Sequence, residues 1–447
     1  MNEPNAQLKR VLGPWDLVLM IIGTVIGSGI FLVPGTILRS VGNSVPLAAM
    51  VWLAGGILSL LGALTYGELS AARPRAGGLY VYIRDCFGAL PAFLFGWTFF
   101  LVISAGSVAT LAVAFSNYVR EFIPLSPLLA KVISVLLILS ITIVNIRGTR
   151  QSANLTNVTT AFKVAVIVAL GIVLWIFGAH PLFEHAANTH TQSTLSGVGV
   201  AMISVLWAYE GWQYVTFSAG ETINPQRTFP LAFLVGTIAL IVIYLLANLG
   251  YVSALGAAGV ADSTRVAASA LAVVVGSGAG KIVGIVILVS MFSAANSILL
   301  TAPRVYYAMA QDGLFFRSLA RIHPTFGTPA FAIGVAGAWS ALLAAIGSFE
   351  QLLTFVVFIG WIFYALAASS VFVYRHREPN SVRTYRVPGY PVTPLIFIVA
   401  AVALVANTIA TQPLRAAIGL GIVLLGVPAY LFWRRQAQIN RADSVVT

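Results

Sequence analysis

The chain has 447 residues, of which 59% are hydrophobic and only 9% are charged, and its mean hydropathy is +0.93. Soluble proteins carry about 25% charged residues, so this composition excludes a soluble globular protein and predicts an all-α polytopic membrane protein. The single cysteine, Cys86, excludes an internal disulfide and a cysteine-based metal site.

The net charge of +12 is distributed unevenly along the chain. If twelve spans place both ends on one side, 18 of the 25 lysine and arginine residues fall on the side of the termini and 6 on the other. Such an excess is typical of the cytoplasmic side of a cell membrane, plasma or inner. We therefore expect a multi-pass protein with both termini cytoplasmic, and the positive charge indicates topology rather than a nucleic-acid partner.

The first expected span, residues 12–38, contains an interruption. Three glycines fall within seven positions, and two of them, Gly27 and Gly29, flank Ser28. A broken helix in hydrocarbon leaves unpaired backbone groups that cost several kcal/mol each, so a break requires a polar occupant. A short helix beginning at Ser28 would direct its N–H groups at an anion such as a carboxylate, and the carbonyls of residues 22–25 would suit a cation. The alternative is a GxxxG face for close helix packing.

Eleven further apolar runs follow, so the sequence predicts twelve transmembrane helices. These runs lie at 45–71, 88–117, 126–146, 155–178, 197–219, 229–252, 281–303, 328–347, 350–374, 393–411 and 413–433. The stretch 266–279 is too short to span a bilayer, which takes roughly 20 residues, and is expected to form an external interfacial or re-entrant helix. His180, His185 and His190 have a spacing that suits neither helical nor strand geometry for a metal site, so a solvated loop is expected there.

The sixth expected span, 197–219, contains a second candidate interruption. Glu210 and Gly211 lie between bulky aromatic residues, about halfway along the span. A carboxylate at that depth costs around 2.5–3.5 kcal/mol and usually faces a cavity. Paired interruptions in corresponding spans indicate the binding site of a transporter. The alternative is that Glu210 is a structural partner that caps the other broken helix.

Lys163 lies about eight residues into the fifth span, about 12 Å from its cytoplasmic end at 1.5 Å per residue. It could snorkel toward the surface. It could instead face the bundle and take the place of a sodium ion between the first break and the eighth span, which offers Ser290, Ser293, Asn296 and Ser297. A buried lysine is also a candidate proton carrier.

An ordered set of motifs runs through the chain. They are VIGSGIF at 25–31, YGEL at 66–69, PRAGGLYVY at 74–82, NIRG at 145–148, WAYEGW at 207–212, ETINP at 221–225, TAPRVYYAMA at 301–310, DGLF at 312–315, IHP at 322–324 and YRVP at 385–388. With Lys163, these residues resemble the L-type amino-acid transporter branch of the amino acid–polyamine–organocation superfamily, over nearly the whole chain.

The resemblance implies a LeuT-like 5+5 inverted repeat plus two C-terminal helices, in a single transmembrane transporter domain over residues 1–447. The first repeat would cover 11–178, the second 197–374, and the additional helices 393–434. It also implies sodium-independent amino-acid exchange by alternating access, with no cofactor.

The resemblance further implies a substrate site at the two interruptions. Its residues would be Val25, Ile26, Gly27, Ser28 and Gly29 of the first span and Trp207, Ala208, Tyr209 and Glu210 of the sixth. The substrate carboxylate would meet the backbone N–H groups of Gly27, Ser28 and Gly29 and the Ser28 hydroxyl. The α-ammonium would meet carbonyls near Val25, Trp207 and Glu210, with Trp207 as an aromatic gate. Lys163 would correspond to the lysine that stands in for a sodium ion.

Two departures from the family pattern bear on partners and specificity. Animal members of this branch are joined by a disulfide to a single-span heavy chain, through a cysteine between the third and fourth spans. The loop at about 118–127 has no cysteine, so the expected partners are amino-acid substrates and the lipid bilayer, without a disulfide-linked heavy chain. Glu210 stands where many neutral-selective relatives have a small residue. It could favour basic substrates or be neutralised by a neighbour.

Other functions are weighed against amino-acid exchange. The nearest is proton-coupled amino-acid symport with Lys163 as the proton carrier. An intramembrane enzyme would need clusters of His, Asp or Glu on facing helices, but only Lys163 and Glu210 lie clearly in the middle of a span. A channel would need a symmetric pore or rings of like charge, which the sequence does not indicate. Both classes are therefore disfavoured.

Overall fold

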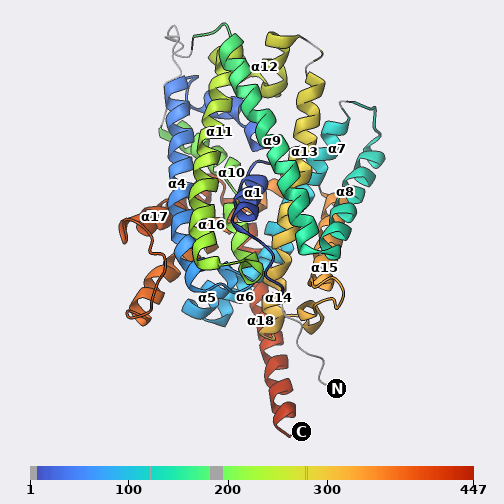
Figure 1. The fold of residues 1–447 in the computed structure, drawn as a ribbon, viewed down its shortest axis with the longest axis vertical. Helices are drawn as coiled ribbons and strands as arrows, with labels where there is room; N and C mark the ends of the chain where they lie inside the picture. Colours follow the sequence, from blue (N-terminus) through green and yellow to red (C-terminus); the bar gives the residue numbers. More distant parts are fainter. Residues whose placement is uncertain are drawn as a thin grey trace.

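The computed structural model describes residues 8–120, 122–181, 195–276, 278, 280–347 and 349–446. These residues form one bundle of helices (Figure 1). In chain order the α-helices are α1 (Pro14–Val25), α2 (Gly29–Leu32), α3 (Pro34–Ser40), α4 (Val45–Ala72), α5 (Leu79–Phe87), α6 (Ala89–Thr98), α7 (Ala105–Val119), α8 (Pro127–Arg147), α9 (Thr149–Phe177), α10 (Leu195–Ala208), α11 (Pro225–Asp262), α12 (Val266–Val275), α13 (Gly280–Thr301), α14 (Pro303–Gln311), α15 (Ala330–Ile346), α16 (Phe349–Arg377), α17 (Val392–Thr411) and α18 (Pro413–Val446). A π-helix, η1 (Phe99–Ser104), and two 3-10 helices, η2 (Trp212–Glu221) and η4 (Arg317–Ala320), complete the set.

Each expected apolar run lies mostly on helix, which confirms the all-α class. Within the described ranges, nine helices are long and apolar enough to cross a membrane. The sixth, ninth and tenth expected spans, on α10, α15 and α16, are not among the nine; α10 has 14 residues and α15 has 17. Twelve crossings therefore remain a prediction.

Local sequence signals explain where several helices begin. The Ser44 hydroxyl accepts the N–H of Leu47 at the start of α4, and the Ser126 hydroxyl accepts the N–H of Leu129 at the start of α8. Such caps satisfy backbone donors that have no partner within the helix. Proline also occupies the first turn of α1, α4 and α8, where its missing N–H costs nothing.

Two of the expected spans are interrupted, as the sequence predicts. The first break, residues 26–28, separates α1 from α2, and the second break, residues 209–211, separates α10 from η2. Gly211 has a φ of 124°, a conformation that glycine adopts without strain. A Cβ at Gly211 would also lie 2.9 Å from the Thr24 side chain. The second break can therefore lie against α1 only with glycine at this position.

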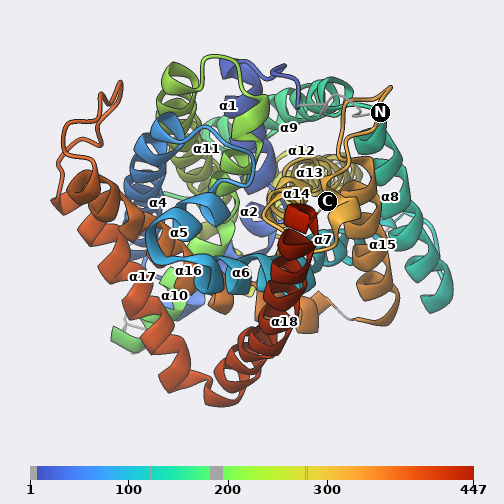
Figure 2. The same ribbon diagram turned by 90° about the horizontal axis from the view of Figure 1, so that it is seen from below.

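The interrupted first span lies inside the bundle, whereas the last two helices lie at its edge. In the first span, Pro14–Leu32, 83% of the most apolar window is buried, against 28% for α17 and 22% for Ala416–Gln436 of α18. α1 packs against α9, α11 and α13. Seen from below, α2 lies near the centre of the bundle, α17 runs along its outer edge, and α18 crosses from the edge toward the middle of the view (Figure 2).

The chain enters α1 and leaves α18 at the same end of the bundle, as an even number of spans requires (Figure 1). The short helix α12, which falls within the expected stretch 266–279, lies at the opposite end. His180 follows α9, and its N–H donates to the Ser253 carbonyl at 3.0 Å. His185 and His190 lie outside the described residues.

Candidate functional site

The first break leaves backbone donors without a partner. The Gly27 N–H donates back to the Val25 carbonyl at 2.8 Å, so it is not available to a ligand in this structure. The N–H groups of Ser28 and Gly29, at the start of α2, donate no hydrogen bond to any described residue. Open N–H groups at the start of a helix favour a negatively charged group.

The carbonyls of the first break are held from two neighbouring helices. Lys163 of α9 is fully buried, and its ammonium donates to the carbonyls of Gly23 at 2.8 Å and Ile26 at 2.6 Å. The Ser290 hydroxyl of α13 lies 2.8 Å from the Ile26 carbonyl and 2.9 Å from that of Gly27. The ammonium is thus directed into the bundle at the first break and does not snorkel to the surface in this structure.

The two breaks are in direct contact. An ideal Cβ on Gly29 would lie 3.0 Å from both Cα and Cβ of Ala208, which is tighter than an ordinary van der Waals contact. The Tyr244 hydroxyl of α11 lies 2.9 Å from the Ala208 carbonyl and 3.2 Å from the Val25 carbonyl. One fully buried phenol therefore bridges the ends of α1 and α10.

Glu210 in the second break is held by its own segment and by α16. Its Oε1 accepts from the Tyr364 hydroxyl at 2.6 Å and from Gln213 Nε2 at 2.6 Å. These partners lie on α16 and η2, so in this structure Glu210 does not cap the first broken helix. The hydroxyl and the amide partly offset the cost of placing a carboxylate at this depth.

A cavity of about 70 Å³ lies between the two breaks, α7 and α13. Its lining residues are Thr24, Val25, Gly27, Ser28, Gly29, Ser107, Thr110, Leu111, Trp207, Ala208, Glu210, Gly211, Tyr214 and Ile298. All but two of the nine implied substrate-site residues line it. Ile26 presents its carbonyl to Lys163 instead, and Tyr209 packs against Trp52 and Tyr244 behind the second break.

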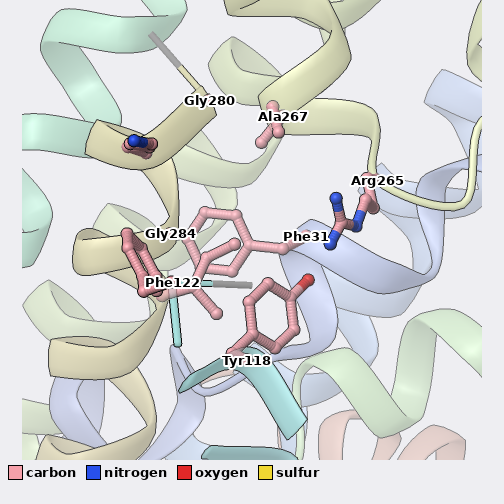
Figure 3. A pocket seen from close by; sticks show the side chains of 10 residues that line it. Phe31, Tyr118, Phe122, Arg265, Ala267, Gly280 and Gly284 are labelled. Carbon is pink, nitrogen blue, oxygen red and sulfur yellow. The ribbon is translucent and has the colours of Figure 1, made fainter. Parts of the chain in front are cut away.

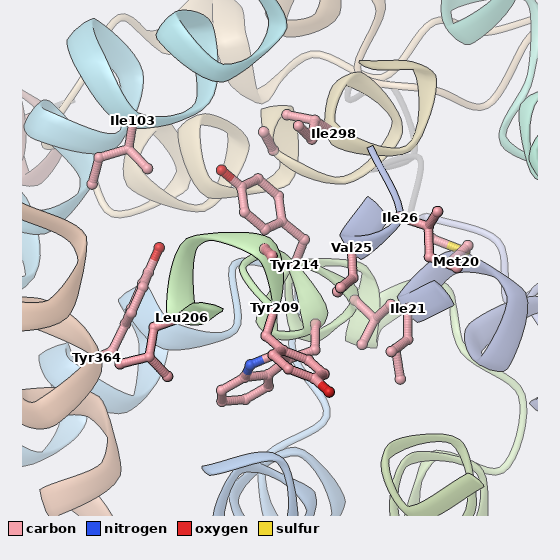
Figure 4. Close-up of a cluster of buried hydrophobic side chains, with 14 of the residues drawn as sticks. Met20, Ile21, Val25, Ile26, Ile103, Leu206, Tyr209, Tyr214, Ile298 and Tyr364 are labelled. Carbon is pink, nitrogen blue, oxygen red and sulfur yellow. The ribbon is translucent and has the colours of Figure 1, made fainter. Parts of the chain in front are cut away.

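The walls of this region come from segments that are far apart in the sequence. Figure 4 shows Val25 of α1, Tyr209 beside the second break, Tyr214 of η2 and Ile298 of α13 gathered around the same region. Ser107 and Thr110 of α7 also line the cavity, although the sequence did not single them out. Hydroxyl residues within spans carry little signal, because most bond to a carbonyl of their own helix, as Ser107 does to Ile103.

A second, wider cavity of about 190 Å³ lies beyond α2. The rings of Phe31, Tyr118 and Phe122 gather there, with Arg265 beside them (Figure 3). Phe31 follows Gly29 by two residues on α2, so α2 contributes to both cavities. The wider cavity lies toward the end of the bundle that carries α12, since residues of α12 also line it.

At the opposite end, where the chain enters α1, one buried and one partly exposed ion pair join neighbouring segments. Arg304 of α14 is fully buried, and its Nε donates to Glu221 Oε2 at 2.6 Å. Thr149 of α9 donates to the same carboxylate at 2.7 Å. Arg150 pairs with Asp16 of α1 at 2.7 Å. These contacts join the start of the first span, α9, η2 and α14.

The fold and the site together define a polytopic helical membrane protein with an internal cavity between two interrupted helices. The family model described as amino acid permease matches residues 12–427. The chain therefore belongs to the amino acid permease family, whose members are transporters of amino acids and not enzymes.

Three relatives match over most of their length. The serine/threonine exchanger SteT of Bacillus subtilis (strain 168) is 31% identical over 434 residues, covering 96% of this chain and 98% of the relative. The human cystine/glutamate transporter is 31% identical over 453 residues, covering 99% of this chain and 89% of the relative. The human large neutral amino acids transporter small subunit 2 is 30% identical over 450 residues, covering 96% and 82%. They support the resemblance to the L-type branch.

Proposed function

We propose that this protein is a sodium-independent amino-acid exchanger that works by alternating access. The observation that carries the proposal is the pair of breaks on one cavity, with unpaired N–H groups on one side and backbone carbonyls on the other. An amino acid carries a carboxylate and an ammonium on the same α-carbon, so its main-chain part is complementary to these two walls. The family and the relatives support amino-acid transport itself.

The substrate carboxylate would accept from the N–H groups of Ser28 and Gly29 and from the Ser28 hydroxyl, which line the cavity. The α-ammonium would donate to carbonyls at the ends of α1 and α10. Tyr244 already donates there, but each carbonyl oxygen has two lone pairs, so a second donor can be accommodated. Trp207 also lines the cavity and would close over the substrate as the gate.

Sodium independence rests on Lys163. Its ammonium donates to the carbonyls of Gly23 and Ile26, beside the Ser290 hydroxyl. Oxygen ligands of this kind suit a hard cation, and the lysine already supplies a positive charge to them. A sodium ion at the same carbonyls would have to displace Lys163 or lie beside a like charge.

Proton-coupled symport is the second candidate, because Lys163 is a fully buried ionisable group in contact with the first break. If the lysine lost and regained a proton in each cycle, the empty protein could change conformation and transport would be net uptake. In the exchange mechanism, the lysine stays charged and only the loaded protein changes conformation.

Several structural expectations belong to the same proposal. The two interrupted segments, one in each of 11–178 and 197–374, are what an inverted repeat would produce, with 393–434 as the two additional helices. The bias of positive charge toward the termini supports a cytoplasmic location for both ends. Cys86 is buried and free, which supports the absence of a disulfide-linked heavy chain.

The test is efflux of preloaded, labelled amino acids from proteoliposomes, measured against a panel of external amino acids in sodium and in choline buffer. We expect efflux only when an external substrate is present, at the same rate in both buffers. A sodium gradient that drives uptake would contradict the proposal. Accumulation driven by an imposed pH gradient would replace it with proton symport.

A further inference from the structure

The cavity between the breaks contains a buried hydroxyl without a partner. Thr110 of α7 lines the cavity, is 4% exposed, and its Oγ1 has no hydrogen-bond partner among the described residues. Most buried serine and threonine hydroxyls bond to a carbonyl of their own helix or to a neighbour, as Thr142 does to the Ile138 carbonyl at 2.7 Å. A buried hydroxyl left unpaired is unfavourable, so Thr110 indicates a ligand group.

Glu210 lines the same cavity and has an unused oxygen. Both of its donors, Tyr364 and Gln213, bond to Oε1. No donor to Oε2 is found among the described residues. A carboxylate can accept about four hydrogen bonds, so Oε2 is available to a donor on a bound molecule. This acceptor and the hydroxyl of Thr110 are side-chain groups, distinct from the main-chain groups that would bind the carboxylate and the ammonium.

The volume of the cavity restricts the ligand that these groups can bind. A water molecule needs about 10–15 Å³ of such space, so 70 Å³ accommodates roughly five to seven water-sized groups. Bonded atoms overlap and take less space than separate water molecules, so this is enough for the main-chain atoms of an amino acid and the two or three non-hydrogen side-chain atoms of serine or threonine. Long basic side chains and aromatic side chains exceed it. An acidic side chain would add a second negative group beside Glu210.

We infer that the site selects amino acids with a small hydroxyl side chain, bound by Glu210 and Thr110. This inference rests on the proposed function. A hydroxyl both donates and accepts, so it can donate to Oε2 of Glu210 and accept from Thr110 with one atom. A methyl group of the same size would leave both protein groups unpaired.

The test compares ligand pairs that differ only in this hydroxyl. Serine and alanine, and threonine and valine, compete with labelled serine for exchange in proteoliposomes of the full chain. Each lost hydrogen bond to a charged group corresponds to about a tenfold change or more in affinity. For the wild type we expect serine and threonine to bind about 10- to 100-fold more tightly than alanine and valine.

Two variants test whether Glu210 and Thr110 cause the preference for serine over alanine. Glu210→Gln and Thr110→Val keep the shapes of the side chains, and each should lower the serine-to-alanine ratio at least about fivefold, mainly through weaker serine binding. Thr142→Val on α8 is the matched control, because that hydroxyl bonds within its own helix. Its ratio should equal that of the wild type.

The outcomes distinguish the inference from the proposed function. Equal affinity for serine and alanine in the wild type, or preference for a basic or large amino acid, would overturn the inference while exchange itself stands. An unchanged serine-to-alanine affinity ratio in both Glu210→Gln and Thr110→Val, with both proteins folded, would also overturn the inference. If no amino acid drives exchange, the proposed function fails and the inference fails with it. The wild-type comparison needs no variant to fold.

Discussion

Replacing Lys163 with methionine tests how the first break is stabilised. The change keeps the length of the side chain but removes the donor to the carbonyls of Gly23 and Ile26. The helical donor expected for the Gly23 carbonyl is the Gly27 N–H, which bonds to Val25 instead. Without Lys163, the Gly23 carbonyl therefore loses its donor outright.

The loss of stabilisation expected for Lys163→Met follows from these contacts. A hydrogen bond to a charged group contributes about 1.5–3 kcal/mol. The Ile26 carbonyl keeps the Ser290 hydroxyl at 2.8 Å, so the loss there is partly offset. We therefore expect about 3 kcal/mol less stabilisation of the first break, which corresponds to roughly a hundredfold lower exchange activity if that geometry is needed for binding.

The assay is exchange in proteoliposomes at several pH values, together with thermal unfolding in detergent. Lys131→Met is the matched control, because Lys131 lies exposed on α8. It should exchange at the wild-type rate. Stimulation of the Lys163→Met variant by sodium would support the view that the lysine occupies a cation position. A Lys163→Met protein with the wild-type rate and pH profile would refute the reasoning.

The other predictions follow from packing and burial. In the Gly29→Ala variant the new Cβ lies 3.0 Å from Ala208 at the end of α10, so exchange should fall at least about tenfold. In the Gly27→Ala variant the nearest atom to the new Cβ is 3.4 Å away, so most exchange activity should remain. Equal losses of exchange activity in the two variants would contradict this account. Glu221→Gln breaks an ion pair whose side chains are 0% and 1% exposed and should destabilise the fold by about 3–5 kcal/mol in unfolding measurements. Glu378→Gln breaks the ion pair with Arg73, whose side chains are 29% (Arg73) and 41% (Glu378) exposed, and should lower the free energy of unfolding by less than about 1 kcal/mol. A larger loss for Glu378→Gln than for Glu221→Gln would contradict this reasoning. Burial raises the pKa of the Cys86 thiol, which makes it unreactive, so the protein should migrate identically with and without reductant.

The two breaks could be predicted from the sequence because hydrocarbon makes them expensive. A bilayer imposes a cost of several kcal/mol on each unpaired backbone group, so residues that permit a break are conspicuous within an apolar run. Gly27 and Gly29 beside Ser28, and Gly211 beside Glu210, are of this kind. The structure places both breaks within the expected segments.

The partners of the breaks could not be predicted in the same way. Tyr244 bridges both broken segments, yet in the sequence it is one aromatic residue in an apolar span. Serine and threonine within spans are equally uninformative, because most bond to a carbonyl of their own helix, as Ser107 does to Ile103. Thr110 differs only in lacking such a partner. That difference depends on side-chain geometry and on the fold around it.

At the proposed site, main-chain groups would bind the part that all amino acids share, and side-chain groups would select among amino acids. The carboxylate and the ammonium are common to all amino acids. Apart from the Ser28 hydroxyl, the atoms proposed to bind them belong to the backbone, which substitutions leave in place. The proposed side-chain end of the site is lined by the side chains of Thr110 and Glu210, which a substitution replaces. Relatives of nearly equal identity to this chain are named for serine and threonine, for cystine and glutamate, and for large neutral amino acids. Overall similarity therefore does not separate these relatives by substrate, and under the proposed function the choice of substrate would be made at the side-chain end of the site.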